Sequence, residues 1–195
     1  MKKLLFILVI LTSVAHAQTA LPKSATDIAP LLIGEKIPNS ILKSSENEAV
    51  SVSDLIKKKK TVLVFYRGGW CPYCNMHLSA LAEAEKQILD TGYQIVAISP
   101  DTPENLKTTK DKVKYTLLSD SKGELIKAFG IAFEAPENYK SVINVNSNVA
   151  NTGFLPVPSV FVINTDGTVV FEYVSPDFKH RMTTELLVSV LKNLK

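Results

Sequence analysis

The residues whose types and spacing could do chemistry are Cys71 and Cys74, the only two cysteines of the chain. At this spacing in a first helical turn their side chains share one face, so they could close a small disulfide. Pro72 suits the first helical position, and the free N–H groups of that turn would direct positive partial charge at both sulfurs. Because a thiolate is the form that attacks disulfides and peroxides, this placement predicts a redox-active pair.

Other interpretations of the cysteine pair stay open. A structural zinc needs four ligands, and outside the amino-terminal leader only His77 and His180 could join the cysteines. A purely structural disulfide is disfavoured, because closing so short a loop removes little entropy from the unfolded chain. We expect His77 to be an exposed helical residue and expect neither a metal nor a cofactor. Copper bound by both thiolates and a histidine is an alternative of another class.

An apolar strand and the helix after it must position the pair. Residues 61–66 form a continuous apolar run with β-branched side chains, which predicts a central strand covered on both faces. Gly68 and Gly69 allow a sharp turn, and a helix with apolar residues at helical spacing follows and stops near Gly92. The cysteines would then lie above the carboxyl end of the strand, a usual place for a site in an open α/β sheet.

Strands and helices alternate through the rest of the chain. Residues 95–99 and 115–118 predict further strands, and an Asp-Gly turn at 166–167 predicts a hairpin at one edge of the sheet. The predicted helices begin at Asp101 and cover residues 124–129 and 184–193. This rhythm predicts a three-layer α/β domain.

Two features lie between the predicted last helices. Residues 132–154 are polar and irregular, with five asparagines at positions 138, 144, 146, 148 and 151, and we expect an insertion that borders the site. Pro158 opens the first strand of the hairpin. In this topology it could present its preceding backbone to a substrate held at the cysteines.

The amino terminus has the pattern of a cleaved secretory signal, with two lysines, an apolar run over residues 4–11 and Ala-His-Ala before residue 18. The run is too short for a membrane span, and no other stretch approaches the length that one needs. We therefore expect a secreted or periplasmic protein, in a compartment where disulfides persist. The expected division is a signal peptide at 1–17, a flexible lead-in at 18–30 and one domain at 31–195.

The composition narrows the class of partner. The formal net charge is only +3 over 195 residues, so no nucleic-acid partner is implied. A hydrophobic content of 46% suits a single domain with an ample core.

Trp70 before Cys-Pro-Tyr-Cys and a late proline before a hairpin resemble the thioredoxin fold. More specifically, the chain resembles peroxiredoxins of the alkyl hydroperoxide reductase/thiol-specific antioxidant (AhpC/TSA) family. The segments that carry this likeness are Gly-Glu-Lys-Ile-Pro at 34–38, Ile-Ser-Pro-Asp-Thr-Pro at 98–103 and Leu-Ser-Asp-Ser-Lys-Gly-Glu at 118–124. The resemblance spans nearly the whole expected mature chain. It implies a thioredoxin-like three-layer α/β domain with a central mixed β-sheet flanked by helices.

The resemblance also implies roles for individual residues. A Pro-x-x-x-Thr-x-x-Cys motif follows the strand in that family, and Arg67, Cys71 and Cys74 stand at its three named positions, which gives Cys74 the peroxidatic place. Arg181 resembles an arginine near the family's active site. The chain departs from the motif at Arg67 and Cys71, and a thiol is a poorer hydrogen-bond partner than the hydroxyl that normally helps hold the peroxide. The charge of Arg67 would compensate for the missing hydroxyl by lowering the pKa of a cysteine thiol.

The expected function is therefore thiol-dependent reduction of hydroperoxides. Cys74 would attack the peroxide, become a sulfenic acid and condense with Cys71, and a thioredoxin-like or other dithiol would reduce the resulting disulfide. Arg67, Trp70, Pro158 and Arg181 are the expected supporting residues. The alternative is a general thiol-disulfide oxidoreductase, since Cys-Pro-Tyr-Cys is also a glutaredoxin pattern. In that case Cys71, expected to be the more exposed sulfur, attacks and Cys74 resolves.

Overall fold

A mixed β-sheet of seven strands forms the centre of the molecule in a computed structural model that describes residues 20–151 and 153–194. The strand order is β2-β1-β5-β4-β3-β8-β9, with β3, β4 and β5 mutually parallel and the other pairings antiparallel. The strands are β1 (Ile41–Lys43), β2 (Ala49–Ser51), β3 (Thr61–Phe65), β4 (Gln94–Ser99), β5 (Thr116–Ser119), β8 (Ser159–Ile163) and β9 (Val169–Val174). The predicted central strand and edge hairpin are confirmed.

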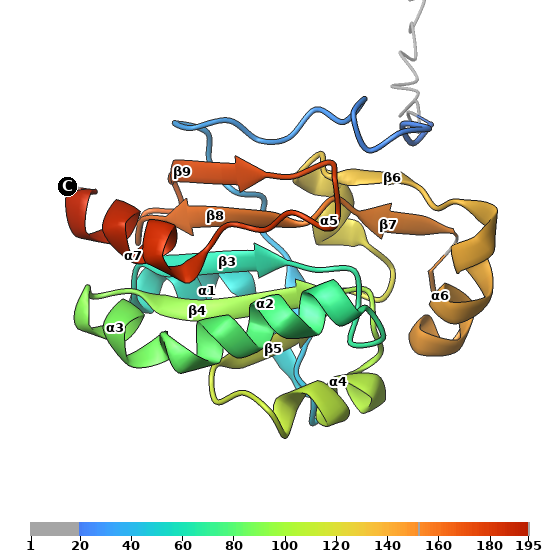
Figure 1. The fold of residues 1–195 in the computed structure, drawn as a ribbon, viewed down its shortest axis with the longest axis horizontal. Coiled ribbons are helices and arrows are strands. Elements are labelled where there is room, and N and C mark those ends of the chain that lie inside the picture. The colour runs from blue at the N-terminus through green and yellow to red at the C-terminus, as the bar shows by residue number, and fades with distance from the viewer. Residues whose placement is uncertain (1–19, 152, 195) are drawn as a thin grey trace, which may run out of the picture.

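Helices cover both faces of this sheet, which confirms the predicted three-layer α/β architecture. Figure 1 shows α2, α3 and α7 in front of the sheet and α1 behind it. The helices are α1 (Val52–Lys58), α2 (Pro72–Glu83), α3 (Glu85–Asp90), α4 (Pro103–Lys110), α5 (Glu124–Ala128), α6 (Lys140–Ser147) and α7 (Thr184–Asn193). The last helix begins and ends where the sequence predicts.

The two faces of β3 explain why its sequence is apolar at every position. Val62 and Val64 belong to the core cluster under α2, α3 and α7, whereas Leu63 and Phe65 belong to the cluster that includes residues of α1 and α5. Phe65 also meets Phe129 at a ring-centroid distance of 4.8 Å. An aromatic contact of this kind adds about 0.5–1.5 kcal/mol beyond the area that it buries. The strand that leads to the cysteines is thus fixed from both sides.

The predicted helix after the cysteines is two helices. Ala84 ends α2 and precedes α3, with φ −89° and ψ 0°. The bend keeps Ile88 fully buried but leaves Leu89 41% exposed, so the apolar spacing serves the core only in part. Neither proline nor glycine marks this break in the sequence, which is why the pattern predicts one continuous helix.

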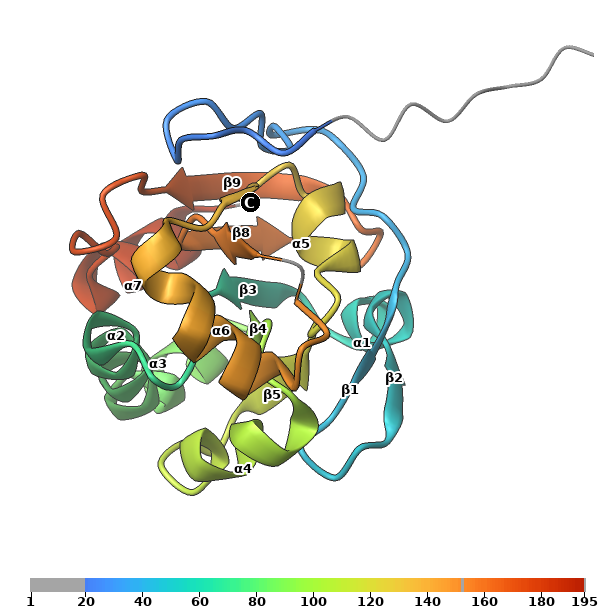
Figure 2. The same cartoon turned by 90° about the vertical axis from the view of Figure 1, so that its right-hand side faces the viewer.

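Most of residues 132–147 form regular structure, so the prediction that the segment 132–154 is irregular was wrong for that part. They contain β6 (Ala132–Glu134), a 3₁₀ turn at Glu137–Tyr139 and α6, and β6 pairs with β7 (Phe154–Pro156) in a separate two-stranded sheet. Figure 2 shows α6 on the side of the molecule that faces the viewer. Asn148 ends α6 in the left-handed conformation, with φ 49°, and Asn151 donates to Phe154 O and accepts from Phe154 N–H, both at 2.9 Å. Asn148 is therefore a helix-ending residue and Asn151 a turn residue.

The amino-terminal residues that are described lie against the domain. Leu21 and Ile28 pack on the core cluster behind the sheet, and the Glu134 N–H donates to Pro22 O at 2.8 Å. The expected lead-in at 18–30 is thus, from residue 20 on, in contact with the insertion and the core. The expected signal peptide at 1–17 lies outside the described residues. Across the described part of the chain, no helix has both the length and the apolar character needed to cross a membrane.

Candidate active site

Cys71 and Cys74 lie at the junction between β3 and α2, as predicted. Cys71 is the N-cap residue and Pro72 the first helical residue. Gly68 makes the turn possible, because its φ is +142° and a Cβ there would lie 2.3 Å from Trp70 Nε1. The Cys71 N–H donates to Gly68 O at 3.1 Å, which holds the cysteines close above the end of the strand.

Both cysteines are buried free thiols. Cys71 is 1% exposed and Cys74 0% exposed, so the predicted order of exposure holds, but the difference is small and both residues are buried. Both belong to the core cluster against which Trp70 packs. A substrate can therefore reach either sulfur only when the groups that cover the cysteines move.

The pKa values of the two thiols are shifted in opposite directions. The pKa of Cys71 is lowered to about 6, chiefly by the neighbouring Cys74 thiol, against the opposing effect of burial, and further by the Cys74 backbone N–H and the charges of Arg67 and Arg181. The pKa of Cys74 is raised well above its usual range, first by its interaction with Cys71 and then by burial. Around neutral pH the pair therefore carries one thiolate, which rests on Cys71.

Replacement of Cys74 by alanine is expected to raise the pKa of Cys71 from about 6 by at least about one unit, because it removes the strongest stabilising donor. Ultraviolet absorbance of the thiolate, followed as a function of pH in wild type and Cys74→Ala, measures this shift. Cys71→Ala is the control, since Cys74 alone should ionise at a higher pH. Equal midpoints for Cys71 in wild type and Cys74→Ala would contradict the shared proton.

Arg181 reaches the site from the connection between β9 and α7. Its Nη2 lies 3.7 Å from Cys74 Sγ, and its Nη1 donates to His180 O at 2.8 Å. Arg181 and Cys74 are 107 positions apart in sequence. The structure thus brings Arg181 to the cysteine that the family resemblance makes peroxidatic.

Arg67 is buried between aromatic rings. Its guanidinium carbon lies 4.3 Å from the ring centroids of both Tyr139 and Phe178, and 5.1 Å from that of Trp70. Only 3% of Arg67 is exposed. Tyr139 comes from the insertion, which therefore borders the site as predicted, and Phe178 comes from the same connection as Arg181. Sequence reasoning missed both rings, because both residues are distant from the cysteines in the chain and no local pattern links them to Arg67.

Pro158 is buried just before β8, and its peptide bond with Val157 is trans. Ser159 is the register partner of Phe65, so Pro158 lies at the end of β3 that leads to the cysteines. Its carbonyl accepts a hydrogen bond from the Ser175 N–H at 3.1 Å. The strand register thus places Pro158 at the same end of the sheet as the turn that carries Arg67.

His77 is buried, which contradicts the prediction that it is exposed. It is 8% exposed, and its Nε2 has no hydrogen-bond partner within the described part of the chain. Burial lowers its pKa to about 4, helped by the charge of Arg181. The helical phase explains this, since His77 lies one turn after Cys74 on the face that also carries the buried Leu78 and Leu81.

The free energy of unfolding should therefore fall between pH 6.5 and about 4. The unfolded chain binds the histidine proton more tightly than the folded chain, so protonation favours unfolding, by up to about 3 kcal/mol over this interval. Urea unfolding at several pH values measures this effect, and His77→Leu should lose that part of the slope. His180→Leu is the matched control, because the His180 side chain is 77% exposed. Parallel profiles for wild type and His77→Leu would contradict the assignment.

Asp101 is a buried support of the turn before the cysteines, whereas the sequence predicts it only as a helix start. The cap of α4 is Thr102, whose hydroxyl accepts from the Asn105 N–H at 3.3 Å. The Asp101 carboxylate instead accepts from the Gly69 N–H at 2.7 Å and from the Ser99 hydroxyl at 3.2 Å. Burial raises its pKa to about 6. This role depends on a contact between distant segments, which local sequence does not reveal.

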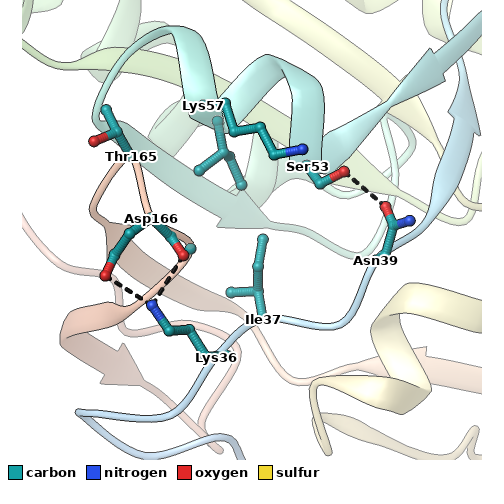
Figure 3. A pocket seen from close by; sticks show the side chains of 9 residues that line it. Lys36, Ile37, Asn39, Ser53, Lys57, Thr165 and Asp166 are labelled. Carbon is teal, nitrogen blue, oxygen red and sulfur yellow. Dashed lines mark hydrogen bonds and ion pairs between the residues drawn. The ribbon is translucent and has the colours of Figure 1, made fainter.

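A surface pocket of about 200 Å³ contains none of the predicted site residues. Figure 3 shows its lining, in which Lys36 Nζ pairs with the Asp166 carboxylate at 2.7 Å and the Ser53 hydroxyl donates to Asn39 Oδ1 at 2.8 Å. Four of its polar side chains thus pair with one another. Within residues 20–151 and 153–194, no group of three or more His, Cys, Asp or Glu side chains is placed to hold a metal ion.

Comparison with known proteins gives the relationship of this chain. Peroxiredoxin Bcp of Escherichia coli K12 is 24% identical over 168 residues, covering 84% of this chain and 97% of that protein. Thiol-disulfide oxidoreductase ResA of Bacillus thuringiensis is 26% identical over 166 residues, covering 83% and 78%. The crystal structure of reduced Prx3 from Vibrio vulnificus in complex with H₂O₂ aligns with a TM-score of 0.70 at 18% identity, covering 84% of this chain and 97% of that chain. Residues 33–172 match the AhpC/TSA family, and with this strand-turn-helix cysteine site the chain belongs to that family.

Proposed function

We propose that the protein is a thiol-dependent peroxidase that reduces hydroperoxides through Cys74 and Cys71. The observation that carries this proposal is the contact of Arg181 with Cys74 Sγ at 3.7 Å, beside a second thiol. A guanidinium can hold the peroxide oxygens and stabilise the negative charge that develops on the leaving oxygen. The likeness to peroxiredoxins supports the same reaction.

The reaction balances with the two thiols as electron donors. The shared proton first moves from Cys74 to Cys71, so that Cys74 becomes the thiolate. Cys74 Sγ then attacks the distal peroxide oxygen, the O–O bond breaks, and the departing alkoxide takes the Cys71 proton to give an alcohol. The Cys71 thiolate displaces hydroxide from the Cys74 sulfenic acid, which leaves a disulfide and, after protonation, water. An external dithiol, of the thioredoxin type in our proposal, exchanges with this disulfide and restores both thiols.

A second candidate function is general thiol-disulfide exchange. The lowered pKa of Cys71 favours it, because the thiolate that rests on Cys71 is suited to attack a substrate disulfide, with Cys74 as the resolving thiol. The likeness to thiol-disulfide oxidoreductase ResA is in keeping with this reaction.

One experiment separates the two functions in the wild-type protein. The fully reduced protein is mixed with one equivalent of hydroperoxide, and loss of the peroxide and the mass of the protein are followed together. A peroxidase consumes the peroxide rapidly and loses two hydrogens as the disulfide forms, and added thioredoxin, its reductase and NADPH make the reaction catalytic. Slow peroxide loss together with rapid reduction of insulin disulfides would favour the oxidoreductase instead.

We also propose that residues 1–17 direct export and are removed. The sequence pattern supports this, and expression of the full chain in a bacterial host tests it. The periplasmic or secreted product should begin at residue 18, as read by mass spectrometry. A full-length product that stays in the cytoplasm would overturn this proposal.

A further inference from the structure

The Arg67 guanidinium is a buried charge with unused hydrogen-bond donors. Arginine carries five N–H donors that point outward in the plane of the group. The Arg67 Nε–H is buried and has no acceptor within the described residues. Buried donors without acceptors are rare in folded proteins, and those that occur call for an explanation. An acceptor that binds at this position would provide one.

The aromatic rings around Arg67 do not supply that acceptor. Tyr139 and Phe178 lie 4.3 Å from the guanidinium carbon, where the negative ring faces stabilise the cation. A ring stacked on the guanidinium leaves the N–H groups at its edge free. The rings therefore stabilise the buried charge of Arg67, and the edge of its guanidinium stays available for an acceptor.

Within residues 20–151 and 153–194, the two arginines near the cysteines have no carboxylate partner. Arg67 and Arg181 both lower the pKa of Cys71, so both guanidiniums act on the pair. Within the described part of the chain, neither arginine takes part in an ion pair with a carboxylate. The nearby Asp101 is engaged by the Gly69 N–H and the Ser99 hydroxyl. Neither guanidinium therefore has a carboxylate acceptor among the described residues.

We propose that the preferred substrate is an organic hydroperoxide that carries a carboxylate, bound by the edge of the Arg67 guanidinium. This inference rests on the proposed peroxidase function. The carboxylate accepts the unused N–H groups, which is the geometry that arginine favours. The half-buried rings of Trp70, Tyr139 and Phe178 hold the apolar body of the substrate. The peroxide group then faces Cys74 and Arg181.

A matched pair of substrates tests the proposal: cumene hydroperoxide and the same molecule with a carboxylate at the para position of its ring. Wild type should show a kcat/KM at least about tenfold higher for the carboxylate, as expected of one charge-assisted contact. Arg67→Gln should bring the ratio of the two kcat/KM values close to one. Any effect of Arg67 on thiolate formation acts on both substrates alike, so the ratio isolates substrate binding.

Two further variants serve as controls. Arg67→Lys keeps the charge and should retain part of the preference. Lys127→Gln removes a positive charge that lies 4.7 Å from the Phe154 ring, far along the chain in α5, and should leave the ratio unchanged. A wild-type ratio near one, with both peroxides consumed, would overturn the substrate proposal and leave the peroxidase function intact.

Failure of the peroxidase function has a different outcome, in which neither hydroperoxide is consumed. Binding is then measured by calorimetry with the unreactive alcohols, 4-(2-hydroxypropan-2-yl)benzoate and 2-phenylpropan-2-ol. Tighter binding of the benzoate by wild type but not by Arg67→Gln supports the carboxylate site. Equal binding of the two alcohols overturns it.

Discussion

Cys74→Ser is expected to abolish hydroperoxide turnover, with a loss of about 10³-fold or more, as for removal of the nucleophile of other enzymes. Cys74 is the sulfur that Arg181 contacts, so serine leaves the peroxide next to a hydroxyl that does not ionise near neutral pH. Cys71→Ser should lose the resolving step but keep a single reaction with peroxide. Rapid-mixing measurements of peroxide consumption in the two reduced variants distinguish these losses.

The position of the sulfenic acid gives the decisive reading. A sulfenic-acid trapping reagent, followed by peptide mass analysis, should label Cys74 in Cys71→Ser. Wild type should give no label, because Cys71 closes the disulfide first. Fast labelling of Cys71 in Cys74→Ser, with slow labelling of Cys74, would reverse the roles of the two residues.

Gly68→Ala is expected to lower the free energy of unfolding by about 3 kcal/mol or more. The residue has φ +142°, and a Cβ there would lie 2.3 Å from Trp70 Nε1 and 2.7 Å from Asp101 Oδ1. Real contacts of this kind do not occur, so the indole ring and the buried carboxylate must both shift. The turn that holds Cys71 shifts with them.

Gly92→Ala is the matched control for this loss. Gly92 has φ +89°, yet no atom lies within 4 Å of the position that a Cβ would take. Its replacement should show only the backbone cost, about 1–2 kcal/mol. Urea unfolding of the reduced proteins measures both values. If the two variants lost equal stability, the contacts around Gly68 would not constrain the turn.

The backbone around the cysteines is readable from the sequence because local patterns determine it. The apolar run of β3, the Asp-Gly turn between β8 and β9, and the Thr183 cap of α7 each act over a few neighbouring residues. The family resemblance adds Arg181, which local patterns alone would not place at Cys74. The layers of the fold and the position of the pair thus follow from signals that a single sequence contains.

The surroundings of the cysteines are not readable in this way. Tyr139 and Phe178 reach Arg67 from segments on opposite sides of β8 in the chain, and Asp101 reaches Gly69 from the neighbouring strand end. His77 is misjudged because a histidine in a helix has no fixed preference for the surface, and burial is decided by helical phase against the core. These contacts depend on tertiary packing, which outweighs the preferences of single residues.

The distance of 107 positions between Cys74 and Arg181 has a consequence for the newly made chain. At roughly 5–20 residues per second, the ribosome adds the arginine roughly 5–20 s after the cysteine. Throughout that interval Cys74 lacks the guanidinium of Arg181, and Arg67 lacks the ring of Phe178. The cysteines of a nascent chain therefore lack one of the two arginines that act on them, and Cys74 gains its guanidinium contact only when synthesis is almost complete.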